Sequence, residues 1–448
     1  LEARARGERV LVVCADPADV PRLAQEMPWF EPNLDVRPLP DWETLPYDVL
    51  SPQEELVSER LEALYRLTAP TGGADVLLTS AVTASQRLSP VSYIGANTFF
   101  FHQGEQISLT TLQKRLAAAG YANVKQVLAA GEFAVRGSIV DVFPMGSERP
   151  FRLDFFDDEI ESIRWFDVDT QRSMESAEEI RLLPGHEFPV DPEALLAFRQ
   201  RWRREFAGDP KKSIVYCDIE KEILPPGIEY YLPLFFDETA ALTDYLPPNA
   251  RVFLLGDIEA ALQAFGRDMA SRYKVLAADP QRPALAPERI WLKPEEFFKS
   301  LANFARFTVE KKENAEDLKC LSGIEVDRKS QNPVGKLLER TRESAMKGVR
   351  TLIAAPSAGR METMSQLLRT GGLSVEEFSD WQTFLEADSS LGISAAPLFS
   401  GAVFHHPEIV ILSEAELYAA SPRRHRLRRV KHATTLEMMV RDVAELKP

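Results

Sequence analysis

Two adjacent phenylalanines with arginines around them have the residue types of a protein-binding surface. They occur in the stretch RLDFFDDEIESIRWFD, residues 152–167. Successive side chains of a β-strand point to opposite faces, so only one of Phe155 and Phe156 can enter the same core. An exposed aromatic ring fills a partner's pocket at little entropy cost, and guanidinium groups make forked hydrogen bonds to carboxylates. The stretch therefore has the chemistry of recognition, provided that one ring faces outward.

Alternation along residues 151–156 predicts which ring that is. The three side chains of one parity are apolar and form the natural core face: Phe151, Leu153 and Phe155. The other face carries Phe156 with Arg152 and, across the predicted hairpin, Arg164. The competing interpretation is that a neighbouring helix or domain of the same chain covers Phe156. The pattern alone does not separate the two.

The pattern also leaves the pairing of this hairpin open. A three-residue turn at 157–159 aligns two apolar pairs, Leu153 with Ile163 and Phe151 with Trp165. The same register sets Glu161 opposite Phe155, which is a mismatch. If the strands of the meander pair in simple antiparallel order, Arg136 of the preceding strand lies near Phe156.

No motif of phosphate or nucleophilic chemistry is complete in this sequence. The Gly335–Lys336 pair has Ser330 where a phosphate loop needs glycine and Leu337 where it needs a hydroxyl. No G-x-G-x-x-G follows a predicted strand, and neither H-E-x-x-H nor G-x-S-x-G occurs. Nucleotide hydrolysis by this segment is therefore a minor alternative, and we expect no catalytic residue and no cofactor.

Metal binding has little support either. The acidic stretch Asp157–Glu159 has hard oxygen ligands, but three acids in a tight turn are more typical of a solvated hairpin tip. The three cysteines, Cys14, Cys217 and Cys320, are far apart and odd in number. They indicate neither a disulfide framework nor a zinc site, which fits a reducing, cytoplasmic setting. We expect no metal.

Charge and length favour a multidomain protein with protein partners. The chain has 448 residues and a net charge of −15, so wrapping of nucleic acid by the whole segment is disfavoured. No stretch has the roughly 20 apolar residues of a membrane span, and there is no secretory signal. One basic run, residues 421–432, could meet DNA phosphates or an acidic protein, although a solvated helix or linker is the favoured interpretation. Its arginines are Arg423, Arg424, Arg426, Arg428 and Arg429.

The elements around these residues predict a multidomain α/β protein. Continuous apolar runs in 8–19 and 74–88 indicate buried parallel strands, and a helix lies between them. For that helix we expect Ser51 as N-cap, with Glu54 completing a capping box. Its apolar face is Val57, Leu61, Leu64 and Tyr65. One further helix and three strand candidates at 137–143, 151–156 and 160–167 then predict a small α+β module.

We expect the chain to be divided into six segments. The first α/β domain takes two of them, before and after the small module, and a linker precedes a further small α/β domain. Their predicted bounds are 1–97 and 187–310 for the first domain, 98–186 for the module, 311–333 for the linker, 334–430 for the last domain and 431–448 for a tail.

Three long motifs resemble the amino-terminal half of the bacterial transcription-repair coupling factor family, Mfd. They are LPDWETLPYDVLSPQEELVSERLEALYRL, GEFAVRGSIVDVFPMGSERPFRLDFFDDEIESIRWFDVDTQRS and LPPGIEYYLPLFF, and the resemblance covers about residues 36–235. The middle module also resembles its counterpart in the excision-repair helicase UvrB. The sequence lacks UvrB's phosphate loop and its tyrosine-rich hairpin, and this difference favours the coupling factors.

The resemblance implies a function. In this family a UvrB-like α/β domain without ATPase activity is interrupted by a module that docks the repair protein UvrA. The family's contact residues correspond to Arg136, Arg152 and Phe156, and Arg164 is our addition from the strand pattern. The implied role is a non-catalytic segment that brings excision repair to stalled transcription complexes. Alanine at Phe156 or Arg152 should then weaken binding with little loss of stability.

The resemblance also implies what lies elsewhere in such a protein. RNA polymerase and double-stranded DNA are bound by later domains, and ATP and magnesium serve the translocase motor that displaces the polymerase. The carboxy-terminal domain is expected to cover the UvrA-docking face. The alternative function is a DNA-binding accessory region of a helicase or UvrB-like repair protein, which would use the basic run.

Overall fold

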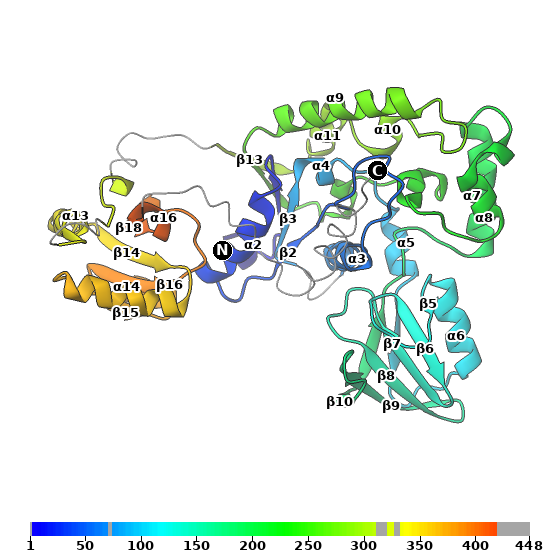
Figure 1. Ribbon diagram of the computed structural model, residues 1–448, viewed down its shortest axis with the longest axis horizontal. Helices are drawn as coiled ribbons and strands as arrows, with labels where there is room; N and C mark the ends of the chain where they lie inside the picture. The colour runs from blue at the N-terminus through cyan, green and yellow to red at the C-terminus, as the bar shows by residue number, and fades with distance from the viewer. Residues whose placement is uncertain (1, 70–73, 311–319, 327–331, 419–448) are drawn as a thin grey trace, which may run out of the picture. The chain divides into compact units, whose positions relative to one another are not determined.

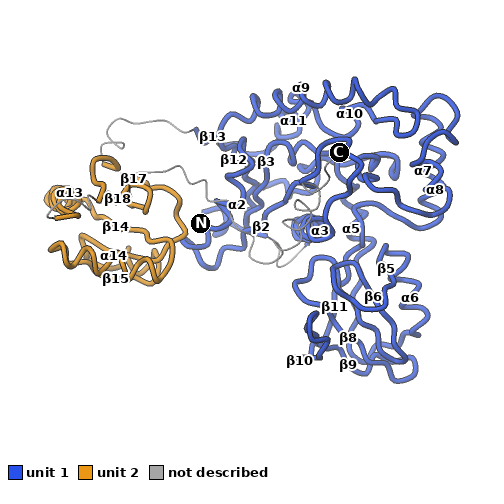
Figure 2. The backbone as a smooth tube through the Cα atoms, viewed as in Figure 1, with its two compact units in different colours: residues 1–312 blue, residues 313–448 orange. Residues whose placement is uncertain are grey.

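The computed structural model describes residues 2–69, 74–310, 320–326 and 332–418 (Figure 1). The chain forms two compact units, residues 1–312 and 313–448 (Figure 2). Of the predicted linker, residues 311–319 and 327–331 lie outside the described residues, and so does the predicted tail. No helix in the described ranges is long and apolar enough to cross a membrane. The chain is a multidomain α/β protein.

The first unit contains a parallel sheet of five strands in the order β13-β12-β1-β3-β2. Three strands precede the small module in the sequence: β1 (Val10–Cys14), β2 (Val36–Pro38) and β3 (Val76–Ser80). Two follow it: β12 (Arg251–Leu255) and β13 (Ala305–Val309). Central strands β1 and β3 are apolar and almost wholly buried, as expected where helices cover both faces of a sheet.

Helices lie on both faces of this sheet (Figure 1). On one face α2 (Asp19–Phe30) packs its Val20 against Val12 and Cys14 of β1. The opposite parity of β1, Leu11 and Val13, shares a core with α3 (Glu54–Thr68) and α9 (Ile258–Leu276). The shorter helices are α1 (Glu2–Ala5), α4 (Ala81–Ala84), α5 (Val91–Ala96), α10 (Pro287–Ile290) and α11 (Pro294–Ser300).

A second, aromatic cluster lies around α7 (Pro192–Glu205), α8 (Ile214–Glu220) and the 3-10 helix η2 (Ile228–Leu234). Trp202 of α7 is buried against Tyr216 of α8. Of two more 3-10 helices, η1 (Pro210–Lys212) lies between α7 and α8 in the sequence and η3 (Leu242–Tyr245) follows η2. Asp191 caps α7 by accepting hydrogen bonds from two backbone N–H groups of the first turn.

The start of α3 differs from the prediction. The helix begins at Glu54 after Gln53, and no side chain caps it. Ser51 instead donates to Glu229 Oε2 at 2.9 Å and accepts from the backbone N–H of Gly227 at 3.0 Å. The hydroxyl of Ser51 therefore makes tertiary contacts and does not cap the helix. The predicted apolar face of α3 is confirmed, because it lies in or against the main core.

The small module is an antiparallel meander with α6 (Leu109–Ala118) packed in the same core. Its six-stranded sheet has the order β10-β9-β8-β7-β6-β5. Strands β6 to β10 pair in simple antiparallel order, as predicted for the meander, whereas β5 pairs with β6 in parallel. The strands are β5 (Ala122–Asn123), β6 (Glu132–Arg136), β7 (Ile139–Phe143), β8 (Phe151–Phe156), β9 (Glu159–Phe166) and β10 (Ser173–Ala177). A separate pair, β4 (Phe99–His102) and β11 (Glu179–Leu182), leads into and out of the module.

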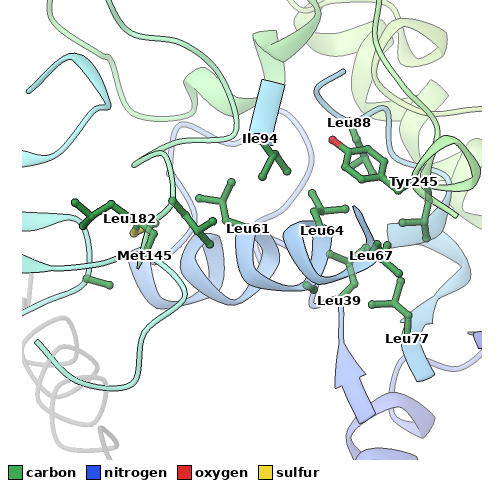
Figure 3. Packing of buried hydrophobic residues seen from close by; sticks show 14 of the residues in the cluster. Leu39, Leu61, Leu64, Leu67, Leu77, Leu88, Ile94, Met145, Leu182 and Tyr245 are labelled. Atoms are coloured by element: carbon green, nitrogen blue, oxygen red, sulfur yellow. The ribbon is translucent and has the colours of Figure 1, made fainter. Parts of the chain in front are cut away.

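Helix α3 connects the module to the parallel sheet through one continuous core (Figure 3). Leu61 and Leu64 of α3 lie in the same buried cluster as Met145 and Leu182 of the module. Because both parts share these contacts, the module is expected to move little relative to the sheet.

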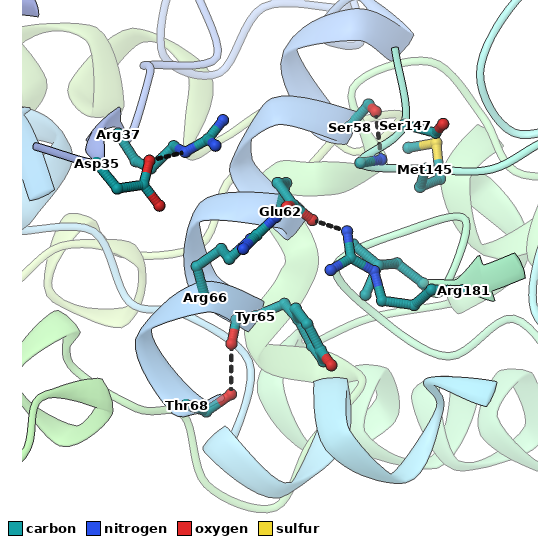
Figure 4. A network of polar contacts seen from close by, with 12 residues as sticks. Asp35, Arg37, Ser58, Glu62, Tyr65, Arg66, Thr68, Met145, Ser147 and Arg181 are labelled. Carbon is teal, nitrogen blue, oxygen red and sulfur yellow. Dashed lines mark hydrogen bonds and ion pairs between the residues drawn. The ribbon is translucent and has the colours of Figure 1, made fainter. Parts of the chain in front are cut away.

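Polar contacts reinforce the same junction (Figure 4). Glu62 of α3 pairs with Arg181 of β11, and Ser58 Oγ accepts from Gly146 N at 2.7 Å. Arg60, fully buried, donates from Nε to Glu187 at 2.6 Å, and the same carboxylate accepts from the Trp42 indole at 3.1 Å. A buried charge is tolerated when it is paired and hydrogen-bonded, which these contacts provide.

The second unit is a five-stranded sheet in the order β15-β16-β14-β18-β17, parallel except for β17 at one edge. Its strands are β14 (Arg350–Ala355), β15 (Glu376–Phe378), β16 (Leu391–Ala395), β17 (Ala402–His405) and β18 (Glu408–Leu412). Its helices are α13 (Gly335–Met346), α14 (Ala358–Thr370), α15 (Trp381–Glu386) and α16 (Glu414–Leu417). The Gly335–Lys336 pair opens α13 and does not follow a strand of this sheet.

Candidate protein-docking site

The outward aromatic ring lies at the end of β8, on the face of the meander that points away from α6. Phe156 is 68% exposed, whereas its neighbour Phe155 is 6% exposed. Phe151 and Leu153 are buried with Phe155, so the predicted assignment of the two strand faces is confirmed. Among the described residues, Phe156 is the most exposed phenylalanine.

The hairpin that carries Phe156 pairs in a register that the sequence pattern only partly predicted. Both predicted apolar pairs form, Leu153 with Ile163 and Phe151 with Trp165. The predicted three-residue turn is wrong, because Phe156 pairs with Glu159 across two residues. A β-bulge leaves Glu161 without a pairing partner and brings Ile160 opposite Phe155. The bulge removes the mismatch, since Ile160 is fully buried.

The tip of this hairpin is fixed by the loop before α6. The backbone N–H of Ile107 donates to Asp158 O at 2.7 Å, and that of Gly104 donates to Ile160 O at 2.8 Å. Gln106 adds a side-chain bond to Glu159 at 2.8 Å. Because the backbone around Phe156 is already ordered, binding through this ring should lose little further backbone entropy.

Two of the candidate arginines share one buried carboxylate, that of Asp141 on β7. Asp141 is fully buried and faces the same side of the sheet as Phe156. Arg152 forms a forked pair with it, Nε to Oδ1 at 2.6 Å and Nη2 to Oδ2 at 3.0 Å. Arg136 donates from Nη2 to the same Oδ2. We did not predict Asp141 from the sequence, although its outward parity beside arginines on neighbouring strands was an available signal.

Arg152 is held more tightly than the sequence suggested. Its Nη1 donates to Gln171 O and to Ser173 Oγ, both at 3.2 Å, and its guanidinium lies 5.0 Å from the ring centroid of Phe166. Hydrogen bonding to Asp141 raises the pKa of Arg152. Only 15% of its side chain is exposed. These contacts predict that alanine at this position lowers stability, in place of the little loss of stability expected from the sequence.

The other two arginines are open to solvent. Arg164 lies opposite Arg152 on β9, is exposed and has no ion pair within the described ranges. Arg136 keeps 49% of its side chain exposed despite its bond to Asp141. The strand ladder places Arg136 level with Ile139 and Asp154, two residues before Phe156. The exposed part of the candidate site thus consists of Phe156, Arg136 and Arg164.

One part of this outer face is closed. Phe166 and Ala134 are buried together with Val127, which belongs to the loop between β5 and β6. This apolar contact covers one end of the sheet and leaves the end with Phe156 uncovered. We call the exposed residues Phe156, Arg136 and Arg164, together with the largely buried Arg152, the docking face. No group of three or more His, Cys, Asp or Glu side chains in the described ranges could hold a metal ion.

The basic run at 421–432 lies outside the described residues. A binding role for its five arginines therefore remains a prediction from the sequence.

Two family models match parts of the chain. One is described as a UvrB interaction domain and matches residues 99–188, which include every residue of the docking face. The other is described as the D3 domain of MFD and matches residues 345–417 in the second unit.

The chain is also similar to curated proteins named transcription-repair-coupling factor. That of Escherichia coli (strain K12) is 42% identical over 298 residues, which are 66% of this chain and 26% of that protein. That of Haemophilus influenzae is 36% identical over 448 residues, 98% of this chain and 38% of that protein. That of Bacillus subtilis (strain 168) is 32% identical over 216 residues, 45% of this chain and 18% of that protein. The chain therefore spans well under half the length of these relatives.

Proposed function

Because this chain belongs to the transcription-repair-coupling factor family, we propose that it recruits the excision-repair protein UvrA to stalled transcription complexes. The observation that carries the proposal is the 68% exposure of Phe156 within the part of the chain that matches a UvrB interaction domain. In the family that this sequence resembles, Phe156, Arg136 and Arg152 correspond to the UvrA contact.

The docking face has the composition of an interface anchor. With 68% of its surface exposed, Phe156 can gain affinity by entering a pocket, because most of its apolar surface is still in water. Arg136 and Arg164 lie on the same face of the sheet, and their guanidinium groups can make forked bonds to carboxylates. The matching surface of UvrA is therefore an apolar pocket with acidic side chains at its rim.

We place the chemistry of the whole protein elsewhere. In this proposal the segment acts by binding alone, and the sequence offers no phosphate loop for it. ATP and magnesium would serve the translocase motor, and RNA polymerase and DNA would be bound by other domains. The parallel sheet and α3 would then hold the docking face in place.

Replacing the anchor tests the proposal. Phe156→Ala in the 448-residue chain should weaken binding to immobilised UvrA by about 2 kcal/mol or more, which is roughly 30-fold in Kd. Thermal stability should stay close to that of the parent, because the ring is not part of the core.

Phe100 provides a matched control. It is a phenylalanine of the same module and is 42% exposed, but it lies on β4, outside the docking face. Phe100→Ala should bind UvrA within about twofold of the parent chain. Equal binding by the Phe156 and Phe100 variants would remove the proposed site.

A further inference from the structure

We propose that Asp141 is a positioning residue of the docking face, which orients the guanidinium groups of Arg136 and Arg152 without touching the partner itself. This inference rests on the proposed docking of UvrA. It assigns a role to a residue that neither the strand pattern nor the family resemblance had marked.

The burial of Asp141 excludes a direct contact with a partner. The residue is fully buried beneath the two arginines. Both carboxylate oxygens accept hydrogen bonds, Oδ1 from Arg152 and Oδ2 from both arginines. Burying a carboxylate is costly unless it is paired and hydrogen-bonded, so the three groups form one unit.

This unit restricts what each arginine can do. Contacts to Asp141, Gln171 and Ser173 engage the Nε, Nη1 and Nη2 atoms of Arg152 and define the plane of its guanidinium. Within the described part of the chain Arg136 is attached through Nη2 alone, so its Nε and Nη1 groups remain available to a partner. A guanidinium that is already oriented loses less rotamer entropy on binding than a free one.

Asp141 also reduces the charge that the partner must neutralise. Two guanidinium groups and one carboxylate carry a net charge of +1 rather than +2. A charge that enters an interface without a partner has a desolvation cost. We infer that UvrA offers one carboxylate to this unit, next to the N–H groups that Arg136 leaves free.

Asp141 could affect binding by orienting the arginines or by changing the electrostatic attraction of the face. These two explanations predict opposite effects of Asp141→Asn on the affinity for UvrA. Asp141→Asn keeps the shape but raises the charge of the face by one unit. If only the field of the face mattered, this change would speed association with an acidic surface and tighten binding. If orientation matters, the association rate stays equal or rises, while the dissociation rate rises more.

The experiment is a kinetic comparison with UvrA by surface plasmon resonance. We expect Asp141→Asn to weaken Kd about tenfold through faster dissociation, since affinity changes of related complexes lie mostly in that rate. Asp154→Asn is the matched control. Asp154 lies on the same face, but its carboxylate accepts from Ser162 Oγ at 3.0 Å rather than from an arginine. Equal or tighter binding by Asp141→Asn would overturn the inference.

A second variant covers the case in which Asp141→Asn does not fold. Arg136→Lys changes a half-exposed side chain and keeps its charge, so the fold should survive. Lysine lacks the planar fork, so this variant should also lose about tenfold in affinity. Parent-like binding by Arg136→Lys would contradict the need for an oriented guanidinium. The Phe156→Ala variant tests the proposed function separately. Loss of UvrA binding in that variant supports the proposed function, and unchanged binding contradicts it.

Discussion

Arg152 and Arg164 lie opposite each other on neighbouring strands, yet their surroundings differ. Arg152 donates to Asp141, Gln171 and Ser173, while Arg164 points into solvent. Strand parity correctly places both on one face, but it says nothing about which charge the protein uses internally. At the scale of single residues, the docking face therefore contains one arginine that stabilises the fold and others that are available to a partner.

This difference predicts unequal costs for the same substitution. Arg152→Ala should lower the free energy of unfolding by about 2 kcal/mol, because it leaves the buried Asp141 with only one cationic partner. Arg164→Ala should change it by less than about 0.5 kcal/mol. Urea denaturation of the two variants measures both values. Similar stabilities of the two variants would show that the pair of Arg152 with Asp141 contributes little.

At the scale of elements, the loop before α3 and the 3-10 helix η2 are joined by an unusual carboxylate. Glu229 of η2 accepts from Ser51 Oγ, and burial raises the pKa of Glu229 from 4.5 to about 7. The folded state therefore binds this proton more tightly than the unfolded state does. Between pH 4.5 and about 7, ionisation of Glu229 favours unfolding, and its contribution to stability falls as the pH rises.

The variant Glu229→Gln isolates this contribution. Relative to the parent, it should gain stability as the pH rises from 4.5 to about 7, with little further change above that window. Denaturation midpoints at several pH values measure the difference. Glu238→Gln, a change at an exposed carboxylate, should show no such trend. If the denaturation midpoints of the parent and of Glu229→Gln varied with pH in parallel, the carboxylate of Glu229 would titrate normally.

At the scale of the whole molecule, the distribution of charge favours an acidic protein over DNA as the partner. The net charge is −15, while the docking face places Arg136, Arg152 and Arg164 on the same side of the sheet as Phe156. A local basic face on an acidic chain attracts an acidic protein surface without attracting DNA over the whole molecule. The DNA-binding alternative depends instead on residues 421–432, which lie outside the described residues.

Salt dependence distinguishes these alternatives. In gel-shift experiments at low salt, we expect the 448-residue chain to leave duplex DNA unshifted, since a strongly acidic chain gains little from releasing counterions. The DNA-binding function would instead give a shift that weakens steeply with salt. Replacing the five arginines of the basic run by alanine would show whether such a shift depends on them. A salt-sensitive shift that is lost in this variant would support DNA binding in place of UvrA recruitment.

The sequence by itself determined the faces of the strands. Residues 151–156 alternate so regularly that an inward Phe155 and an outward Phe156 follow from hydrophobicity and the period of a strand. Whether another part of the chain covers Phe156 did not follow from the pattern, and the structure leaves that ring 68% exposed. The same local regularity predicted the apolar face of α3 and the antiparallel order of the meander. These features were readable because neighbouring residues decide them.

Only the tertiary structure decided which polar groups meet. The bulge at Glu161, the contact that takes Ser51 away from α3 and the sharing of Asp141 by two arginines all join residues from separate segments. A hydrogen-bonding side chain has several satisfactory partners, so its local sequence does not select one. Packing brings a particular donor and acceptor together away from water, and that proximity makes the choice.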